Sequence, residues 1–311
     1  MKAAVLHAGA SAPTVEDVPS PEPGAGQLEL RVLAASLNPV DLWIAMGQHP
    51  VFRPERPYVP GFEGVGRVTG GGGTAGQRVW WLGGVGALAE QAIAQIDDAV
   101  DVPDALSDVE AAAIGIAGLA AWLALVERAG VSPGERVLVL GASGAVGRFA
   151  VQIARAVGAE RVVGAARTGS DELHELGAHA FVSLAEMEGL TDRLLDAEPR
   201  GYDVVIDPLF GAPLEAALEA AAPNARVVCL SALAGGPVSL SNAIFEKGLS
   251  IIGHRNSATE ASVRRVAYLA LAKKVVSGEI RVGAETCRLE GIADAWLRQA
   301  GSPHCKLVVL P

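Results

Sequence analysis

The sequence predicts a two-domain α/β protein, in which a β-rich first part is followed by a parallel sheet with helices on both faces. The length of 311 residues suits two domains of ordinary size. Half of the residues are hydrophobic and 19% are charged, which is enough apolar material for a large core. After about residue 107, apolar strands alternate with helices, and this alternation is typical of a parallel sheet.

The first part of the chain is expected to form a small barrel or sandwich, because short β-branched runs alternate with Pro, Gly and Asn. The expected strands cover residues 1–6, 28–37, 64–68, 78–81 and 89–94, with a glycine turn at 70–73. Ser107 followed by Glu110 predicts a capping box that opens a helix. The uncharged run from Ala111 to Val126 is 16 residues long. A membrane span needs about 20, so a buried helix is expected there.

The second part is expected to alternate regularly. The expected strands cover residues 136–140, 161–166, 203–206, 226–230 and 249–252, and the expected helices cover 145–157 and 214–222. A last stretch is expected to form a helix at 262–276, a strand at 286–289, a helix at 292–299 and a strand at 306–310.

Charge and cysteine content exclude several classes of protein. The 35 acidic residues against 25 basic ones give a net charge of −10, which argues against nucleic acid and favours a small molecule in a local site. The three cysteines, Cys229, Cys287 and Cys305, are odd in number and widely spaced. This excludes a disulfide framework and an all-cysteine zinc site, and it favours a cytoplasmic protein. The apolar start is too short for a signal peptide, so no membrane partner is expected.

A glycine-rich segment is the strongest local signal. Gly141-Ala142-Ser143-Gly144-Ala145-Val146-Gly147 directly follows an apolar strand and opens an apolar helix, which is the context of a dinucleotide-binding fingerprint. The second glycine would let a pyrophosphate approach the backbone, and the third would let the helix pack on the sheet. The first glycine of the strict pattern is replaced by alanine. An ordinary tight turn is the alternative. The candidate cofactor-binding residues here are Ala142, Ser143, Gly144, Ala145, Val146 and Gly147.

The end of the next strand indicates which dinucleotide is bound. NAD-binding proteins tend to carry an acidic residue about 20 positions after the glycines, where it binds the ribose 2′-hydroxyl. Here Arg167 occupies that place and Thr168 follows it. A guanidinium suits a 2′-phosphate, so the cofactor is predicted to be NADP(H). A solvated arginine at a strand end is the alternative.

Taken together, these segments resemble the medium-chain dehydrogenase/reductase superfamily, and within it the zinc-free quinone oxidoreductase branch. The resemblance covers nearly the whole chain. It rests on the opening Met1–Ala3, on Ser36–Asp41, on Pro57–Gly66, on Ser132–Glu135 with the glycine loop, and on Cys305–Val309.

The resemblance implies a Rossmann doubly wound parallel sheet inserted into a GroES-like β-barrel catalytic domain. The expected bounds are 1–114 with 255–311 for the catalytic domain and 115–254 for the NADP(H)-binding domain. Members of this superfamily are commonly dimers or tetramers, and a homodimer is expected here. Ser231, which follows an expected strand, is a further candidate for cofactor binding because the family binds cofactor at that sheet edge.

The resemblance also bears on metal binding. Zinc alcohol dehydrogenases of this superfamily hold a catalytic zinc with cysteine, histidine and a further cysteine or acid, and the matching positions here are Asn38, Phe62 and Ile116. Residues 70–88 contain no cysteine for a structural zinc. Without zinc to polarise an alkoxide, the expected reaction is NADPH-dependent hydride transfer to a quinone or an α,β-unsaturated carbonyl.

The expected catalytic residues follow the segment that begins at Asn38. Asn38 could contact the cofactor ribose or a substrate carbonyl, or it could be a turn residue. Family members often carry tyrosines shortly after it, whereas this chain has Trp43 and His49. His49 could donate a hydrogen bond or a proton, and Trp43 could stack on the substrate. An ordinary loop histidine and a core aromatic are the alternatives. Threonine is frequent in the family where this chain has Ala120.

Two other functions remain compatible with the sequence. One is a biosynthetic tailoring enoyl reductase that acts on one specialised intermediate. The other is a non-catalytic NADPH-binding sensor.

Overall fold

The computed structural model describes residues 1–311, which form two compact units. The first unit contains Met1–Ile116, Glu260–Val276 and Val282–Pro311, and the second contains Ala117–Thr259 and Ser277–Arg281. The sequence placed the boundaries at 114/115 and 254/255. The structure has them at 116/117 and 259/260 and adds a short later segment to the second unit.

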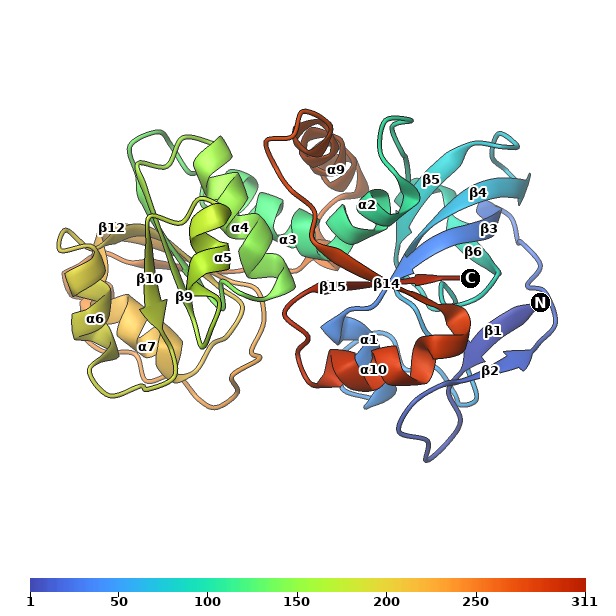
Figure 1. Ribbon diagram of the computed structural model, residues 1–311, viewed down its shortest axis with the longest axis horizontal. Coiled ribbons are helices and arrows are strands. Elements are labelled where there is room, and N and C mark those ends of the chain that lie inside the picture. Colours follow the sequence, from blue (N-terminus) through green and yellow to red (C-terminus); the bar gives the residue numbers. More distant parts are fainter. The chain divides into compact units, whose positions relative to one another are not determined.

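The second unit is built on a six-stranded parallel sheet in the order β10-β9-β8-β11-β12-β13 (Figure 1). In chain order this arrangement is 3-2-1-4-5-6, which is the doubly wound order. Ligands of such sheets bind beyond the carboxyl ends of the strands, where the strand order reverses, and here that point lies between β8 and β11. The strands are β8 (Arg136–Leu140), β9 (Arg161–Ala166), β10 (Ala180–Ser183), β11 (Tyr202–Asp207), β12 (Ala221–Cys229) and β13 (Ser250–Gly253).

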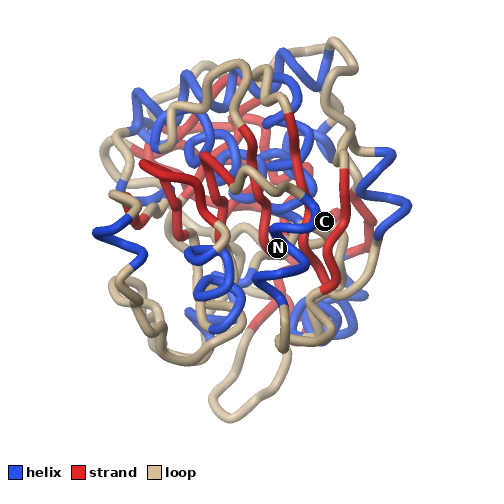
Figure 2. Tube along the Cα trace, turned by 90° about the vertical axis from the view of Figure 1, so that its left-hand side faces the viewer, coloured by secondary structure: helices blue, strands red, loops and turns tan.

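Helices cover both faces of this sheet, as its apolar strands require. α4 and α5 lie on one face, and α6 and α7 lie on the other (Figure 1). Strands run through the interior while helices lie toward the outside (Figure 2). The helices of this unit are α3 (Leu119–Trp122), α4 (Ala145–Ala156), α5 (Ser170–Glu175), α6 (Leu190–Ala197), α7 (Ala212–Glu219) and α8 (Ala243–Glu246).

The first unit contains a seven-stranded sheet in the order β14-β15-β3-β4-β5-β7, with β6 paired to β3, and a separate hairpin of β1 and β2. Both ends of the chain contribute to the larger sheet, because β15 pairs with β3. The strands are β1 (Lys2–Val5), β2 (Thr14–Asp17), β3 (Gln27–Ser36), β4 (Glu63–Gly71), β5 (Arg78–Leu82), β6 (Gln91–Gln95), β7 (Ala99–Asp101), β14 (Ala284–Arg288) and β15 (Lys306–Leu310). The helices are α1 (Pro39–Ala45), α2 (Asp108–Ala113), α9 (Ala261–Val276) and α10 (Ile292–Ala300).

The long apolar helix predicted after Ser107 forms but is interrupted. The capping box is confirmed: Glu110 N donates to Ser107 Oγ at 3.2 Å, and Ser107 N donates to Glu110 Oε2 at 3.0 Å. Helical structure runs from Asp108 to Arg128, with a π-helical turn and a break at Gly115, where ψ is −113°. By length and composition this helix could cross a membrane, but 72% of its apolar window is buried inside the protein, as in a core helix.

Other sequence predictions need correction. The helix predicted at 214–222 begins at Ala212 and ends at Glu219, because Ala221 already starts β12. The predicted glycine turn at 70–73 begins as strand, since β4 continues to Gly71 and pairs there with Leu28. Several elements were missed because none is longer than eight residues, which is too short for a clear sequence period; they are β2, α1, β7, α5, β10, α6 and α8. The three cysteines are free.

Candidate active site

The glycine segment forms a tight turn between β8 and α4. Gly141 has φ +61°, which is a left-handed conformation. It therefore provides the tight turn that the strict fingerprint assigns to a glycine one position later, where this chain has Ala142. Gly144 N donates to the Gly141 carbonyl oxygen at 3.0 Å, which closes the turn. A Cβ at position 147 would lie 2.3 Å from the Gly141 oxygen and 2.5 Å from Ala142 Cα. Only glycine therefore permits this close approach of helix and turn.

This turn presents the start of α4 to the carboxyl end of the sheet. Gly144 is the N-cap and the helix continues for 12 residues, so the first-turn N–H groups lack helical partners and carry the positive end of the helix dipole. Ala142 and Ser143 are buried, whereas Gly144, Ala145 and Val146 are half-buried. The geometry fits a pyrophosphate bound to backbone N–H groups.

The other predicted cofactor residues also lie at the carboxyl ends of strands in this unit. Arg167 and Thr168 follow β9 and are exposed. Arg167 has no hydrogen bond or ion pair in the structure, so its guanidinium is available to a ligand. Ser231 follows β12 and is half-buried.

In the first unit, a buried polar cluster surrounds Glu63, at the start of β4. The Glu63 side chain is completely buried, and its two oxygens accept four hydrogen bonds. Oε1 accepts from Asn38 Nδ2 at 2.8 Å and from Lys306 Nζ at 3.3 Å. Oε2 accepts from Trp80 Nε1 at 3.0 Å and from the backbone N of Ile116 at 2.7 Å. The carboxylate is therefore a structural hub that joins four segments of the first unit.

The break in the long helix explains how this hub forms. A Cβ at Gly115 would lie 1.8 Å from Glu63 Oε2 and 2.5 Å from Trp80 Nε1. Any side chain there would displace the carboxylate. Glycine at this position thus allows the helix to open and Ile116 N to reach Glu63.

Asp41 and Lys306 add two further buried ionisable groups. Asp41 Oδ2 accepts from Asn38 N at 2.8 Å, and Oδ1 accepts from Phe62 N at 2.9 Å, so Asp41 ties α1 to the segment that leads into Glu63. Burial raises the pKa of Asp41 to about 7. Burial also lowers the pKa of Lys306, although the adjacent Glu63 carboxylate opposes that shift.

The predicted catalytic residue Asn38 is part of this cluster. Its Nδ2 donates to Ser36 O at 3.1 Å and to Glu63, and its Oδ1 accepts from Lys306 Nζ. Every polar atom of this amide has a protein partner and the residue is 2% exposed. These contacts favour a supporting role, and a contact with cofactor or substrate stays a prediction.

His49 follows α1 and is buried rather than an exposed loop residue, with 4% of its surface accessible. Its Nδ1 accepts from Val51 N at 3.3 Å and from Phe52 N at 3.0 Å. In the neutral ring the proton is therefore on Nε2. The ring packs against Phe52 and Phe62, with centroid distances of 5.3 and 5.8 Å. Trp43 lies in α1 and is half-buried.

The three positions that match zinc ligands contain no suitable donor set. The Asn38 amide is engaged, Phe62 is a buried ring in the aromatic group with His49, and Ile116 contributes its backbone N to Glu63. No group of three His, Cys, Asp or Glu side chains that could hold a metal ion occurs in the structure.

Comparisons with known proteins agree with the fold. Residues 24–104 match the alcohol dehydrogenase GroES-like domain, and residues 145–271 match the family described as zinc-binding dehydrogenase. The chain is 35% identical over 246 residues to a quinone oxidoreductase of Sus scrofa, covering 76% of this chain and 74% of that protein. The structure of a quinone oxidoreductase from Thermus thermophilus, also solved in complex with NADPH, matches with TM-score 0.83 and 30% identity over 100% of both chains.

A different relative is much larger. A phenolphthiocerol/phthiocerol polyketide synthase polypeptide of Mycobacterium tuberculosis is 32% identical over 95% of this chain, but the chain spans only 14% of that protein's length. Fold and similarity together define an oxidoreductase with a Rossmann-type domain and a GroES-like domain. The chain belongs to the medium-chain dehydrogenase/reductase superfamily, with its quinone oxidoreductase branch among the relatives.

Two buried charged residues at strand ends were not predicted from the sequence. Lys306 starts the apolar strand β15, and Asp207 ends the apolar strand β11. A charge beside an apolar run was the available signal, because a charged side chain in a buried strand needs a specific partner.

Proposed function

We propose that this protein is an NADPH-dependent oxidoreductase that transfers hydride to a quinone or an α,β-unsaturated carbonyl without zinc. The observation that carries the proposal is the closed glycine turn at the start of α4, together with the exposed and unpaired Arg167 after β9. The turn suits a pyrophosphate, and a free guanidinium suits a 2′-phosphate. Bound NADPH would supply the hydride, while the chain's own residues bind and orient the reactants.

The cofactor preference can be tested by binding measurements. NADPH should bind at least tenfold more tightly than NADH, because a 2′-phosphate–arginine pair contributes on the order of 1.4 kcal/mol or more. Arg167→Ala should remove this preference and leave NADH affinity nearly unchanged. Arg200→Ala provides a control, since this exposed arginine lies just before β11 and so at the amino end of the sheet, away from the carboxyl edge. Equal affinity of the native protein for NADH and NADPH would contradict the NADP(H) assignment.

The acceptor can be identified by following NADPH oxidation with quinones, enones and enoyl thioesters. Consumption with quinones or small enones supports the leading proposal. The similarity to a polyketide synthase polypeptide over 95% of this chain favours a second candidate, a tailoring enoyl reductase, which would instead use an enoyl thioester or a pathway intermediate. NADPH binding without any consumption would favour a non-catalytic sensor.

Independence from zinc rests on the residues at the three ligand positions. An amide, a phenyl ring and an aliphatic side chain replace the usual donors, and the Lys306 ammonium already lies against Asn38 and Glu63. Activity should persist after dialysis against a strong chelator, and elemental analysis should find less than stoichiometric zinc. Loss of activity on chelation with recovery on adding Zn²⁺ would contradict the proposal.

His49 is proposed to donate a hydrogen bond or proton from Nε2 to the developing oxyanion of the substrate. Two variants separate this role from loop support. His49→Asn keeps an oxygen where Nδ1 accepts from Phe52 N, but it removes the Nε2 donor. His49→Gln removes the Nδ1 acceptor and retains a donor near Nε2. Both variants lose the packing of the ring on Phe52 and Phe62, so the comparison between them is decisive. The proposal expects kcat to fall about 10²-fold or more in His49→Asn and by much less in His49→Gln, and unchanged turnover in His49→Asn would contradict it.

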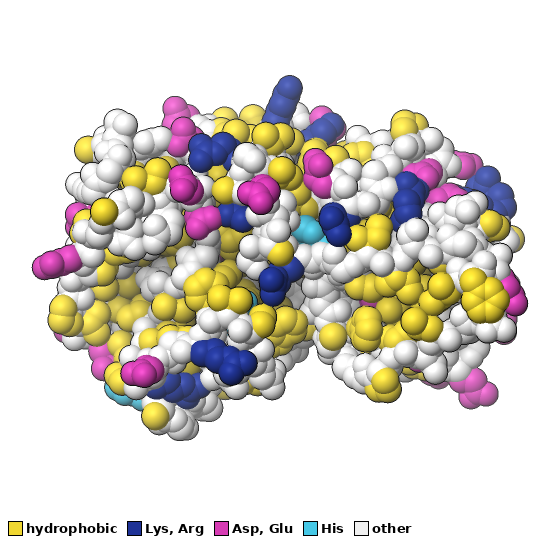
Figure 3. Space-filling view, turned by 180° about the vertical axis from the view of Figure 1, so that it is seen from behind, with side chains coloured by type: hydrophobic (Ala, Val, Ile, Leu, Met, Phe, Trp, Pro, Cys, Tyr) yellow, Lys and Arg dark blue, Asp and Glu magenta, His cyan; other side chains and the backbone are white.

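The partners are proposed to be a small-molecule substrate and a second copy of the chain, in the cytoplasm. Lys and Arg are interspersed with Asp and Glu on the face in Figure 3, which supports the absence of a nucleic-acid partner. β13 is an edge strand. Ile251 on this strand and Phe245 on α8, the helix that precedes it in the chain, are 39% and 71% exposed, which favours a homodimer. Light scattering should give twice the mass of one chain, and Phe245→Glu should shift the measured mass toward that of a single chain. A monomeric native protein would contradict the homodimer.

A further inference from the structure

Asp207 is a buried acid that the proposed function does not use. It is the last residue of β11 and is completely inaccessible to solvent. β11 lies directly beside β8, with Ile206 opposite Val139, so Asp207 sits next to the start of the glycine turn. A carboxyl group in such a place costs free energy unless it forms specific hydrogen bonds.

One oxygen of Asp207 holds a strained turn. Oδ1 accepts from Leu209 N at 2.8 Å and from Phe210 N at 2.9 Å. Phe210 has φ +62°, a left-handed conformation that side chains rarely adopt, and Gly211 follows with φ +64° and ψ −151°. Such a conformation persists only when its surroundings hold it. The Asp207 carboxyl supplies two of the hydrogen bonds that do so.

The strained turn packs on the first glycine of the cofactor turn. A Cβ at Gly141 would lie 3.0 Å from Leu209 Cδ2 and 3.3 Å from Pro208 Cγ. These two side chains therefore pack against the left-handed Gly141. If the turn after Asp207 relaxes, Gly141 loses that packing.

The second oxygen of Asp207 has an unusual environment. Oδ2 is buried without an N–H or O–H partner, and the thiol of Cys229, the paired residue on β12, contacts the carboxyl group. Burial raises the pKa of Asp207 and raises that of Cys229 to about 12, so the thiol keeps its proton and remains a weak donor. The essential contacts of Asp207 are therefore those of Oδ1.

We infer that Asp207 is a positioning residue for the dinucleotide turn: through the turn at 208–211 it holds Gly141 in the conformation that presents the start of α4 to the cofactor. This inference rests on the proposed NADP(H) function. Asp207→Ala should raise the Kd and KM for NADPH tenfold or more, because the turn loses both hydrogen bonds. kcat at saturating NADPH should change less than threefold, since a positioning residue does not touch the reacting atoms. Asp207→Asn keeps an oxygen for both N–H groups and should retain affinity within threefold.

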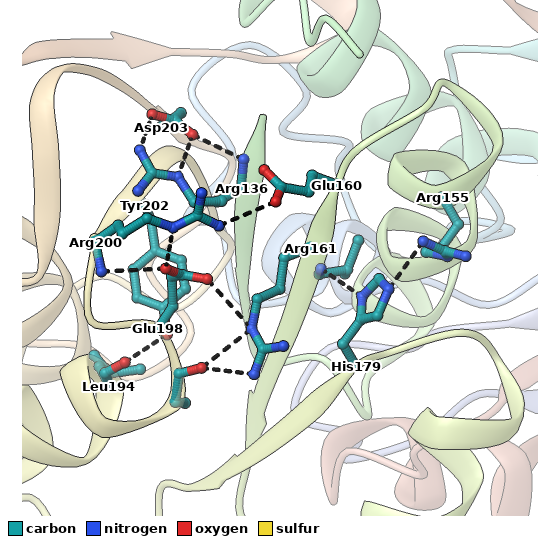
Figure 4. Close-up of polar contacts among 12 residues, drawn as sticks. Arg136, Arg155, Glu160, Arg161, His179, Leu194, Glu198, Arg200, Tyr202 and Asp203 are labelled. Carbon is teal, nitrogen blue, oxygen red and sulfur yellow. Dashed lines mark hydrogen bonds and ion pairs between the residues drawn. The ribbon is translucent and has the colours of Figure 1, made fainter. Parts of the chain in front are cut away.

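Asp203→Ala is the matched control. Asp203 lies at the other end of the same strand and accepts from Arg136 N, Nε and an Nη at 2.8, 2.7 and 2.6 Å (Figure 4). Its loss should lower stability without changing the Kd for NADPH. If Asp207→Ala binds NADPH like the native protein, or if Asp203→Ala weakens binding equally, the positioning role is wrong.

A readout without cofactor separates this inference from the proposed function. Amide hydrogen exchange of the full chain should show faster exchange at Ala142 and Gly144, which donate to Ala165 O and Gly141 O, in Asp207→Ala. The same amides should be unchanged in Asp207→Asn and Asp203→Ala. Unchanged exchange in Asp207→Ala overturns the inference. A native protein that binds no NADPH overturns the proposed function, while the exchange result still decides the inference.

Discussion

Replacing Lys306 by methionine tests the buried cluster around Glu63. Methionine keeps most of the apolar stem but removes the ammonium, which donates to Leu37 O, Asn38 Oδ1 and Glu63 Oε1. Lys306 is 3% exposed and Glu63 is not exposed, so water cannot replace the lost donor. Removing one partner of a buried ion pair costs about 3–5 kcal/mol. We expect a loss of that size in the free energy of unfolding.

Urea unfolding followed by tryptophan fluorescence is the suitable assay. Four of the five tryptophans lie in the first unit, so the signal reports mainly on the unit that contains the cluster. Lys273→Met, at an exposed lysine of α9, is the control and should change stability by less than about 0.5 kcal/mol. Adding Glu63→Gln to Lys306→Met should cost less than the sum of the single changes, because the unpaired carboxylate is gone. A loss below about 1 kcal/mol, or strict additivity in the double variant, would refute this reasoning.

Three further predictions concern other buried groups. Because the pKa of Asp41 is raised to about 7, the folded protein holds a proton there that the unfolded chain releases near pH 4. As the pH rises toward 7, the free energy of unfolding should therefore fall, relative to that of Asp41→Asn, by up to about 1.4 kcal/mol per pH unit. Parallel pH profiles of the two proteins would count against this prediction. Gly147→Ala should lower the free energy of unfolding by about 1–3 kcal/mol and weaken NADPH binding at least tenfold. Gly253→Ala is the control, because no atom lies within 4 Å of the added Cβ, and it should change neither thermal melting nor NADPH binding. Tyr202→Phe should lower the free energy of unfolding, measured in urea, by about 1 kcal/mol, because the hydroxyl donates to Leu194 O at 2.7 Å. An unchanged free energy of unfolding would show that this hydrogen bond is not stabilising.

Local sequence patterns were sufficient to predict most of the longer strands and helices of the second unit. β8 and β9 begin and end at the predicted residues, and α4 ends one residue before its predicted end, because apolar periodicity and glycine placement act over short distances in the chain. The short elements between residues 170 and 197 were missed. They are four to eight residues long, which is too short for a sequence period to be recognised, and packing on the sheet stabilises them instead.

The roles of single residues were less predictable. The sequence indicated that a glycine supplies the tight turn, but the structure places the left-handed conformation at Gly141. The sequence offered His49 as a hydrogen-bond or proton donor with an ordinary loop histidine as the alternative; the structure buries it against Phe52 and Phe62 with its tautomer set by backbone N–H groups. A side chain in a loop such as the one that contains His49 can point toward solvent or toward the core, and only tertiary packing decides which of the two it does.

The sequence by itself determined the fold class, the superfamily, the position of the cofactor turn and the lack of zinc ligands at the matching positions, because each depends on residue type at a given place in the chain. Only the tertiary structure decided that Lys306 is the buried cation beside Asn38 and Glu63, more than 240 residues apart in sequence, and that Asp207 accepts hydrogen bonds from Leu209 N and Phe210 N in the turn beside Gly141. Those contacts depend on how strands pair and on which charges lose water together, and neither is encoded in any local pattern.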